Sequence, residues 1–290
     1  MKIKDILTIN LSEDIKNVID LEVISEKEIQ DEIENYIVTD GLAREYVTFV
    51  DIFTSNILET GVWISGFYGS GKSYFGKLLG YMLSNRNIGG TPARDRINQR
   101  FTGISDEALV KNALSRLESI NSRVVFLDIA KQDTSKGLAF TLFRNFLKSL
   151  HFPENEHGIF LYQWMLSEGK TRVHQFIADE TGADWNELRT ISFKYAKAIK
   201  ELFIKKGNTE ADYLNIITTI RRDIDQFSSS RLREELANYL QIEKNEKVIF
   251  LFDEASEAIN QHKFNLFDPE GLSESLSSLG GKVWTIAIAS

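Results

Sequence analysis

Apolar and polar positions along the chain predict short strands separated by helices. Four short, mostly apolar runs, at 61–65, 123–129, 248–252 and 283–289, are typical of strands buried in a parallel sheet. Much of the remaining chain has apolar residues three and four positions apart, which is the spacing of amphipathic helices. This alternation predicts an α/β fold in which helices flank a parallel sheet.

Helical spacing is most regular before the first strand and between the second and third. Residues 26–60 contain a Glu-rich stretch followed by apolar residues at helical spacing, which predicts an N-terminal helical segment, 1–55, ahead of a core, 56–290. The connection at about 134–246 is long for a single crossover and holds several amphipathic stretches. We therefore expect a helical insertion there. Packing is the expected role of its apolar residues, and a partner groove is the alternative.

A glycine-rich turn follows the first predicted strand. Residues 66–73, GFYGSGKS, match the phosphate-loop pattern G-x-x-x-x-G-K-[ST] at every position. Glycines let successive N–H groups surround an anion, and the N-terminus of the next helix points at the same place. Lys72 would contact the β- and γ-phosphates, and the Ser73 hydroxyl would ligate Mg²⁺. The residues expected to bind ATP here are Gly66, Phe67, Tyr68, Gly69, Ser70, Gly71, Lys72, Ser73 and Tyr74.

Two carboxylates, Asp253 and Glu254, come directly after the third predicted strand. Ligands of parallel sheets bind beyond the carboxyl ends of the strands, so we expect both residues to lie near the phosphate loop. Asp253 is the expected Mg²⁺ residue together with Ser73, and it would also contact the nucleotide site. Glu254 would orient and polarise the water that attacks the γ-phosphate, which makes Glu254 and Lys72 the expected catalytic residues. The alternative is a strand followed by an aspartate that caps the next helix.

Composition restricts the kinds of protein that this chain can be. The chain has 42% hydrophobic and 26% charged residues, which is ordinary for a globular protein and excludes a disordered chain. It has no cysteine, so disulfides and Cys-based zinc sites are excluded, and its four histidines are too scattered to predict a metal site. We find no secretory signal and no apolar run near the ~18 residues of a membrane span. We therefore expect a cytoplasmic protein without membrane contact.

The formal net charge of −8 argues against a surface that binds nucleic acid as a whole. Residues 85–100 are a local exception, because they contain four arginines and one aspartate beside a Gly-Gly-Thr-Pro turn signal. We expect an exposed loop at this position. A solvated loop is the favoured interpretation, and a local nucleic-acid contact is the alternative.

Several stretches together resemble the N-terminal ATPase region of the BrxC/PglY proteins. The resemblance covers most of the chain and is strongest at 36–83, 123–151 and 248–260, where YIVTD and GVWISGFYGSGKS are its most specific parts. These are large P-loop proteins of bacterial BREX and phage-growth-limitation defence systems. The resemblance implies a P-loop NTPase fold of the AAA+-like, additional-strand, catalytic-glutamate (ASCE) division. It also implies an ATPase that serves an anti-phage complex acting on DNA.

Further expectations follow from the same resemblance. The last strand should insert between the first and third and end in a polar residue near the γ-phosphate, for which Ser290 is the candidate and a plain strand end the alternative. Homo-oligomers should form through the ATPase core, other defence-system proteins should be partners, and DNA contacts are open for the full-length protein. An ATP-gated scaffold and a DNA-binding module, both with little turnover, are the alternatives from other functional classes.

The printed sequence stops directly after the apolar run 283–289. Natural C-termini are usually polar and poorly ordered. We therefore expect a fragment of a larger protein, whose ATPase core is truncated at its C-terminal end and lacks a lid and an arginine finger.

Overall fold

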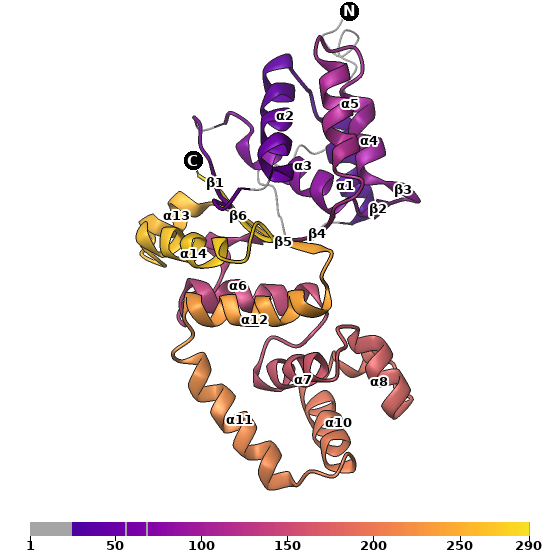
Figure 1. Cartoon of the computed structure of the whole chain (residues 1–290), viewed down its shortest axis with the longest axis vertical. Coiled ribbons are helices and arrows are strands. Elements are labelled where there is room, and N and C mark those ends of the chain that lie inside the picture. The colour runs from indigo at the N-terminus through magenta and orange to yellow at the C-terminus, as the bar shows by residue number, and fades with distance from the viewer. Residues whose placement is uncertain (1–24, 56, 68, 290) are drawn as a thin grey trace, which may run out of the picture.

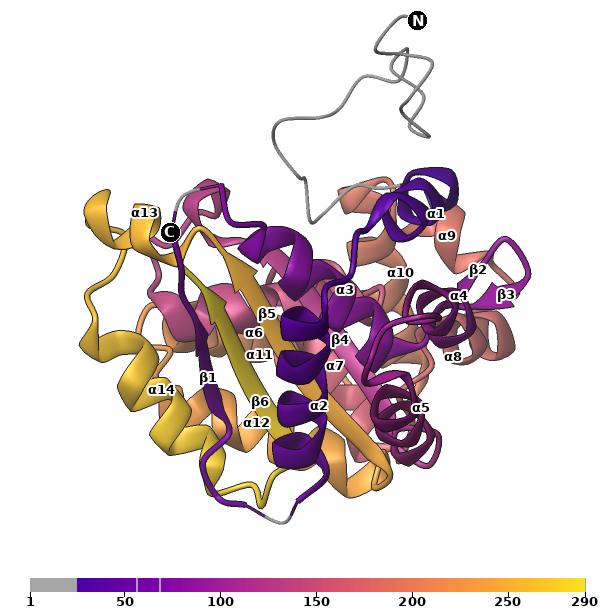
Figure 2. The same cartoon turned by 90° about the horizontal axis from the view of Figure 1, so that it is seen from above.

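The structure, a computed structural model, describes residues 25–55, 57–67 and 69–289. Within these residues a parallel sheet has four strands in the order β1-β6-β5-β4. Figure 2 shows the strands side by side, with helices in front of and behind them. The predicted parallel sheet is thus confirmed, and the last strand lies between the first and third as expected. The strands are β1 (Gly61–Ile64), β4 (Asn121–Asp128), β5 (Glu246–Asp253) and β6 (Val283–Ile288).

The strand before the glycine-rich turn differs from its prediction. We predicted a buried strand, but β1 pairs with β6 alone among the described residues and forms an edge of the sheet. Its side chains alternate between exposed and half-buried, and Trp63 is 44% exposed. A run of four residues is too short to distinguish an edge strand from an interior one by hydrophobicity. The interior strands β5 and β6 are buried along their lengths, as predicted.

Five helices cover one face of the sheet, above the strands in Figure 1. The described part of the predicted N-terminal segment, 1–55, is helical and contains two helices, while residues 1–24 of that prediction lie outside the described residues. Ser25 and Glu28 form a capping box at the start of the first, and the Thr39 hydroxyl caps the second. Both share one apolar cluster with the sheet, for example through Phe53 and Trp284. The five helices are α1 (Glu26–Asn35), α2 (Asp40–Thr54), α3 (Lys72–Ser84), α4 (Ala93–Arg100) and α5 (Glu107–Arg116).

The opposite face carries α6 (Leu138–Ser149), α12 (Ser229–Ile242) and α14 (Phe267–Ser277), while the short α13 (Ala255–Asn260) follows β5. The segment predicted as an insertion is helical, but its first and last helices, α6 and α12, lie against the sheet (Figure 1). The helices between them extend away from it. The amphipathic stretch 185–206 forms two helices, which are separated at 189–191. These outer helices are α7 (Glu156–Ser167), α8 (Val173–Thr181), α9 (Trp185–Leu188), α10 (Ser192–Lys205) and α11 (Glu210–Ile224).

The arginine-rich stretch 85–100 is not the exposed loop that we predicted. It forms a hairpin of β2 (Asn87–Ile88) and β3 (Thr91–Pro92) and then α4. Arg94 is buried and donates hydrogen bonds to main-chain carbonyls at the C-terminal ends of α3 and α5. Arg96 and Arg100 also donate to main-chain carbonyls. Helix ends leave carbonyls without partners, and these arginines satisfy some of them, so they are not a free basic patch.

None of the helices in the described ranges has the length and apolar character that crossing a membrane requires.

Candidate functional site

The glycine-rich turn links the carboxyl end of β1 to the first residue of α3. Gly69 and Gly71 have φ angles of 76° and 84°, a region that favours glycine because a Cβ atom is strained there. The Ser70 N–H donates to the Phe67 carbonyl at 3.1 Å, which closes the turn. The Phe67 side chain is 91% exposed. Tyr68, also predicted to contact the nucleotide, lies outside the described residues, as does Ser290.

Lys72 folds back along the turn that precedes it. Its Nζ donates to the Phe67 carbonyl at 2.7 Å, and the residue is 9% exposed. A Cβ atom at Gly66 would lie 3.1 Å from Ser70 Oγ and 3.4 Å from Lys72 Cδ, so the missing side chain leaves room for the lysine. An ammonium group has three donors, and the bond to Phe67 uses one of them. The remaining donors of Lys72 suit an anion bound at the turn.

The N-terminus of α3 is open to a negatively charged ligand. Gly71 is its N-cap residue and provides no side-chain cap, and the first turn has no acidic residue. The first main-chain N–H groups of a helix have no partner within the helix, and together with the helix dipole they attract phosphate. The glycines of α3 bring it close to the sheet, since a Cβ atom at Gly76 would lie 2.2 Å from Ile288 Cδ1.

The carboxyl end of β5 meets the start of α3, as predicted. Asp253 is the last residue of β5, and its carboxylate lies close to the Ser73 side chain. Burial raises the pKa of Asp253, and the Ser73 hydroxyl and a hydrogen bond from the Glu254 N–H offset part of this rise. The charge of Lys72 also acts on this carboxylate. The structure therefore brings Asp253 close to Lys72 and Ser73, which lie 180 or more positions before it in the sequence.

Glu254 turns the chain out of the sheet. It has φ 57° and ψ 34°, a left-handed conformation that is strained for a residue other than glycine. Burial raises the pKa of its carboxyl, and the nearby charges of Asp253 and Glu257 raise it further. Glu254 occupies the N-cap position of α13, yet no side chain caps this helix, so helix capping does not explain either carboxylate. A half-buried carboxyl group with a raised pKa is suited to accept a proton.

The Tyr74 side chain is turned toward α1. Its ring stacks on that of Tyr36 with centroids 5.1 Å apart, and its hydroxyl donates to the Glu32 carbonyl. The Glu32 carboxylate accepts from Lys77 Nζ at 2.6 Å, and Lys77 is 2% exposed. Tyr81 also donates to this carboxylate. Glu32 therefore links the N-terminal segment to α3, the helix that begins at the phosphate loop. The side chain of Tyr74 takes part in this contact, and its main-chain N–H lies in the first turn of α3.

Asp128 is a further residue of this site that the sequence did not single out. It ends β4 and lies in register opposite Asp253 on β5. It is 5% exposed, and its carboxylate pairs with Lys131 Nζ at 2.8 Å. Its charge also contributes to the raised pKa values of Asp253 and Glu254, after burial. The sequence offered one signal, which is an aspartate at the end of a predicted interior strand. The meaning of this signal depends on the neighbouring strand, which places Asp253 opposite Asp128.

The donors near the phosphate loop fit Mg²⁺ that arrives with a polyphosphate. No group of three or more His, Asp or Glu side chains in the described ranges is arranged to hold a metal ion without other ligands. Ser73 and Asp253 supply oxygen atoms, which Mg²⁺ prefers. In such sites Mg²⁺ keeps several waters and takes its remaining ligands from phosphate oxygens. The protein donors are therefore sufficient for a metal–nucleotide complex.

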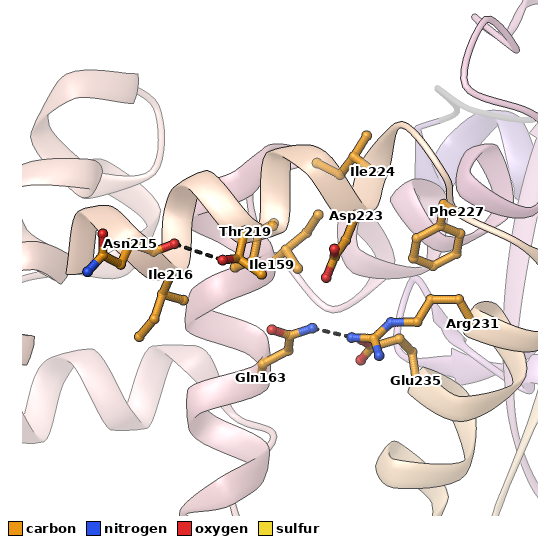
Figure 3. A pocket seen from close by; sticks show the side chains of 11 residues that line it. Ile159, Gln163, Asn215, Ile216, Thr219, Asp223, Ile224, Phe227, Arg231 and Glu235 are labelled. Atoms are coloured by element: carbon orange, nitrogen blue, oxygen red, sulfur yellow. Dashed lines mark hydrogen bonds and ion pairs between the residues drawn. The ribbon is translucent and has the colours of Figure 1, made fainter. Parts of the chain in front are cut away.

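Two cavities, of about 260 and 380 Å³, lie in the helical insertion, and no predicted site residue lines them. Figure 3 shows the first, between α7, α11 and α12. Its wall combines apolar residues with polar ones such as Asn215, Thr219 and Asp223. In the same wall, the buried Glu235 accepts hydrogen bonds from Gln163 and Arg231, each at 2.7 Å. Its chemistry does not identify a ligand.

Comparison with known proteins leaves the family open. The chain matches no family model and no solved structure. The likeness to the BrxC/PglY proteins therefore stays a prediction from sequence, and the site is argued from its own geometry.

Proposed function

We propose that this chain has a P-loop NTPase fold of the AAA+-like ASCE division and that it binds and hydrolyses ATP with Mg²⁺. The observation that carries this proposal is the contact between Ser73, at the phosphate loop, and Asp253, at the end of a separate strand. The positive φ angles of Gly69 and Gly71 and the uncapped N-terminus of α3 support a phosphate ligand at the turn. The strand order β1-β6-β5-β4 agrees with this fold.

Each residue has a role that follows from its position. The N–H groups of the turn and of the first turn of α3 bind the phosphates, and Lys72 exchanges its bond to the Phe67 carbonyl for a phosphate oxygen. Ser73 and Asp253 hold Mg²⁺, which neutralises charge on the β- and γ-phosphates when it is bound. Glu254 orients the attacking water and accepts its proton. Its raised pKa strengthens it as a base.

The biological setting is proposed from the sequence resemblance. We propose an ATPase component of a BREX-type anti-phage complex in the cytoplasm, which forms homo-oligomers through its core and binds other defence proteins. In this proposal ATP drives assembly or remodelling on DNA. Support comes from the stretches 36–83, 123–151 and 248–260. Turnover measured with the full-length protein, with and without DNA and partner proteins, tests this setting.

The site assignment is tested by Lys72→Ala and Glu254→Gln, with Glu274→Gln as the matched control. Glu274 is exposed and lies on α14, and its charge is not among those that shift the pKa of Asp253 or Glu254. We expect Lys72→Ala to abolish ATP binding in calorimetry without unfolding the protein. Glu254→Gln should retain binding but lose roughly 10²-fold in turnover, because the amide cannot accept the proton of the water. The control should stay within about twofold of the parent, since an exposed carboxylate that touches no reacting atom contributes little to catalysis.

Two outcomes would contradict the assignment. Unchanged ATP affinity in folded Lys72→Ala protein would contradict the assignment of a phosphate-binding site at this turn. If Glu254→Gln hydrolysed ATP at the parental rate, Glu254 would serve only as the junction between β5 and α13. That result would favour the alternative of an ATP-gated scaffold.

A further inference from the structure

Asp128 is a buried carboxylate that the proposed mechanism leaves without a role. Its Oδ1 atom is inaccessible to solvent and has no hydrogen-bond partner among the described residues. The other oxygen, Oδ2, pairs with Lys131 Nζ at 2.8 Å. Burying a charged acceptor without a donor is unfavourable, and such groups are rare in folded proteins. The Oδ1 atom therefore has hydrogen-bonding capacity that no described residue uses.

The alternation of side chains along the strands places Asp128 on the same face as the phosphate-loop helix. Asp128 shares a face of the sheet with Phe126, two residues before it, and Asp253 shares one with Leu251. Phe126 and Leu251 both lie against α3 at Gly80. Because Asp128 is opposite Asp253 in register, the two carboxylates are neighbours on this face. The charge of Asp128 adds to burial in raising the pKa of Asp253.

The segment that follows β4 is held in place. It forms a short 3-10 helix, Ile129–Lys131, and Lys263 donates hydrogen bonds to the carbonyls of Ala130 and Gln132 on either side of its end. Lys263 comes from the connection between α13 and α14. The position of Asp128 is therefore fixed relative to the carboxyl end of β5.

We propose that Asp128 is a third residue of the magnesium site, beside Ser73 and Asp253, and that it holds the ion through a water molecule of its hydration shell. This inference rests on the proposed function. A water bound to Mg²⁺ is a strong hydrogen-bond donor, and Mg²⁺ keeps several waters when it binds proteins. Oδ1 has almost no accessible surface in the structure, so this role requires the carboxylate to turn toward the ion when Mg²⁺ binds. The divalent charge also offsets the repulsion among Asp128, Asp253 and Glu254.

This role predicts opposite effects on two binding constants. Removing the charge of Asp128 takes away a hydrogen-bond acceptor for the hydrated ion, so Mg²⁺ binding weakens. The same change removes a negative charge near the phosphates, so ATP binding without metal stays the same or tightens. Residues that serve folding alone would weaken both constants together. Lys131 neutralises part of the charge of Asp128, so removing the charge of Lys131 should strengthen Mg²⁺ binding.

The test uses the 290-residue chain and a fluorescent ATP analogue. Its affinity is measured in EDTA, and Mg²⁺ is then titrated at a fixed nucleotide concentration. For Asp128→Asn we expect a roughly tenfold weaker apparent Mg²⁺ affinity and unchanged or up to about threefold tighter binding in EDTA. Lys131→Met should tighten Mg²⁺ binding about two- to threefold, since the charge it leaves uncompensated is partly screened by solvent. Asp133→Asn is the control, because Asp133 is exposed in the same connection, and both constants should match the parent.

Each outcome decides the proposal. Parental Mg²⁺ dependence in Asp128→Asn, or equal weakening of both constants, would overturn the role of Asp128 while leaving ATP binding intact. If Asp128→Asn does not fold, Lys131→Met decides, and unchanged or weaker Mg²⁺ binding in that variant overturns the role. A parent protein that binds no nucleotide in either condition would refute the proposed function itself.

Discussion

The close contact between α3 and the sheet makes a prediction about two glycines in helices. Gly80 lies in α3, and a Cβ atom there would be 2.3 and 2.4 Å from two ring atoms of Phe126 and 3.3 Å from Leu251 Cδ1. Gly271 lies in α14, where a Cβ atom would meet nothing within 4 Å. The same change, glycine to alanine, should therefore destabilise the protein at Gly80 and stabilise it at Gly271.

The magnitude follows from two opposing terms. Alanine is better than glycine within a helix by about 1 kcal/mol. At Gly271 this term acts alone, so we expect the free energy of unfolding to rise by about 1 kcal/mol. At Gly80 a ring must move out of a packed position, and overpacking of this kind costs up to about 3 kcal/mol. The net result for Gly80→Ala is a loss of about 2 kcal/mol.

Urea denaturation followed by circular dichroism measures both changes, and Phe126→Leu tests the cause. Leucine lacks the ring atoms that meet the new Cβ, so Gly80→Ala should cost almost nothing when it is made in Phe126→Leu protein. An equal loss in both backgrounds would refute the steric explanation. A stabilising Gly80→Ala change in the parent would show that α3 does not approach β4 this closely.

Three further predictions concern charged residues. Asp253→Asn should weaken Mg²⁺-dependent ATP binding at least about tenfold and leave metal-free binding intact, which the same EDTA and Mg²⁺ titrations measure. Lys77→Met should destabilise the protein by about 3 kcal/mol in urea, because Glu32 loses its buried partner, and adding Glu32→Gln should restore most of this loss. Burial raises the pKa of Glu235 above its ordinary 4.5, so the stability of the parent relative to Glu235→Gln should fall as the pH rises from about 4 to 7, measured by thermal unfolding. A constant difference across this range would contradict the last prediction.

The sequence was sufficient to predict those parts of the candidate site that lie within a short stretch of the chain. The eight residues from Gly66 to Ser73 contain the whole turn, and the strand that ends at Asp253 is a continuous apolar run. Both signals lie within short stretches of sequence, so no knowledge of distant contacts was needed. The parallel sheet, its strand order and the helices before it were predicted for the same reason or from the resemblance.

Features that depend on neighbours in space were missed or mistaken. The role of Asp128 depends on its register with Asp253, which the sequence of β4 does not contain. The edge position of β1 depends on how many strands pair with it. Arg94 was placed in an exposed loop because arginines are usually solvated, yet helix ends that are distant in sequence supply carbonyls for its guanidinium group.

The contact between Glu32 and Lys77 limits how the protein can be divided. Cutting the chain before residue 56 would leave the ammonium group of Lys77 without Glu32, and would uncover the apolar side of α3 that α1 and α2 now cover. The helices of the N-terminal segment therefore fold as part of the same core as the sheet and cannot be exchanged as a module.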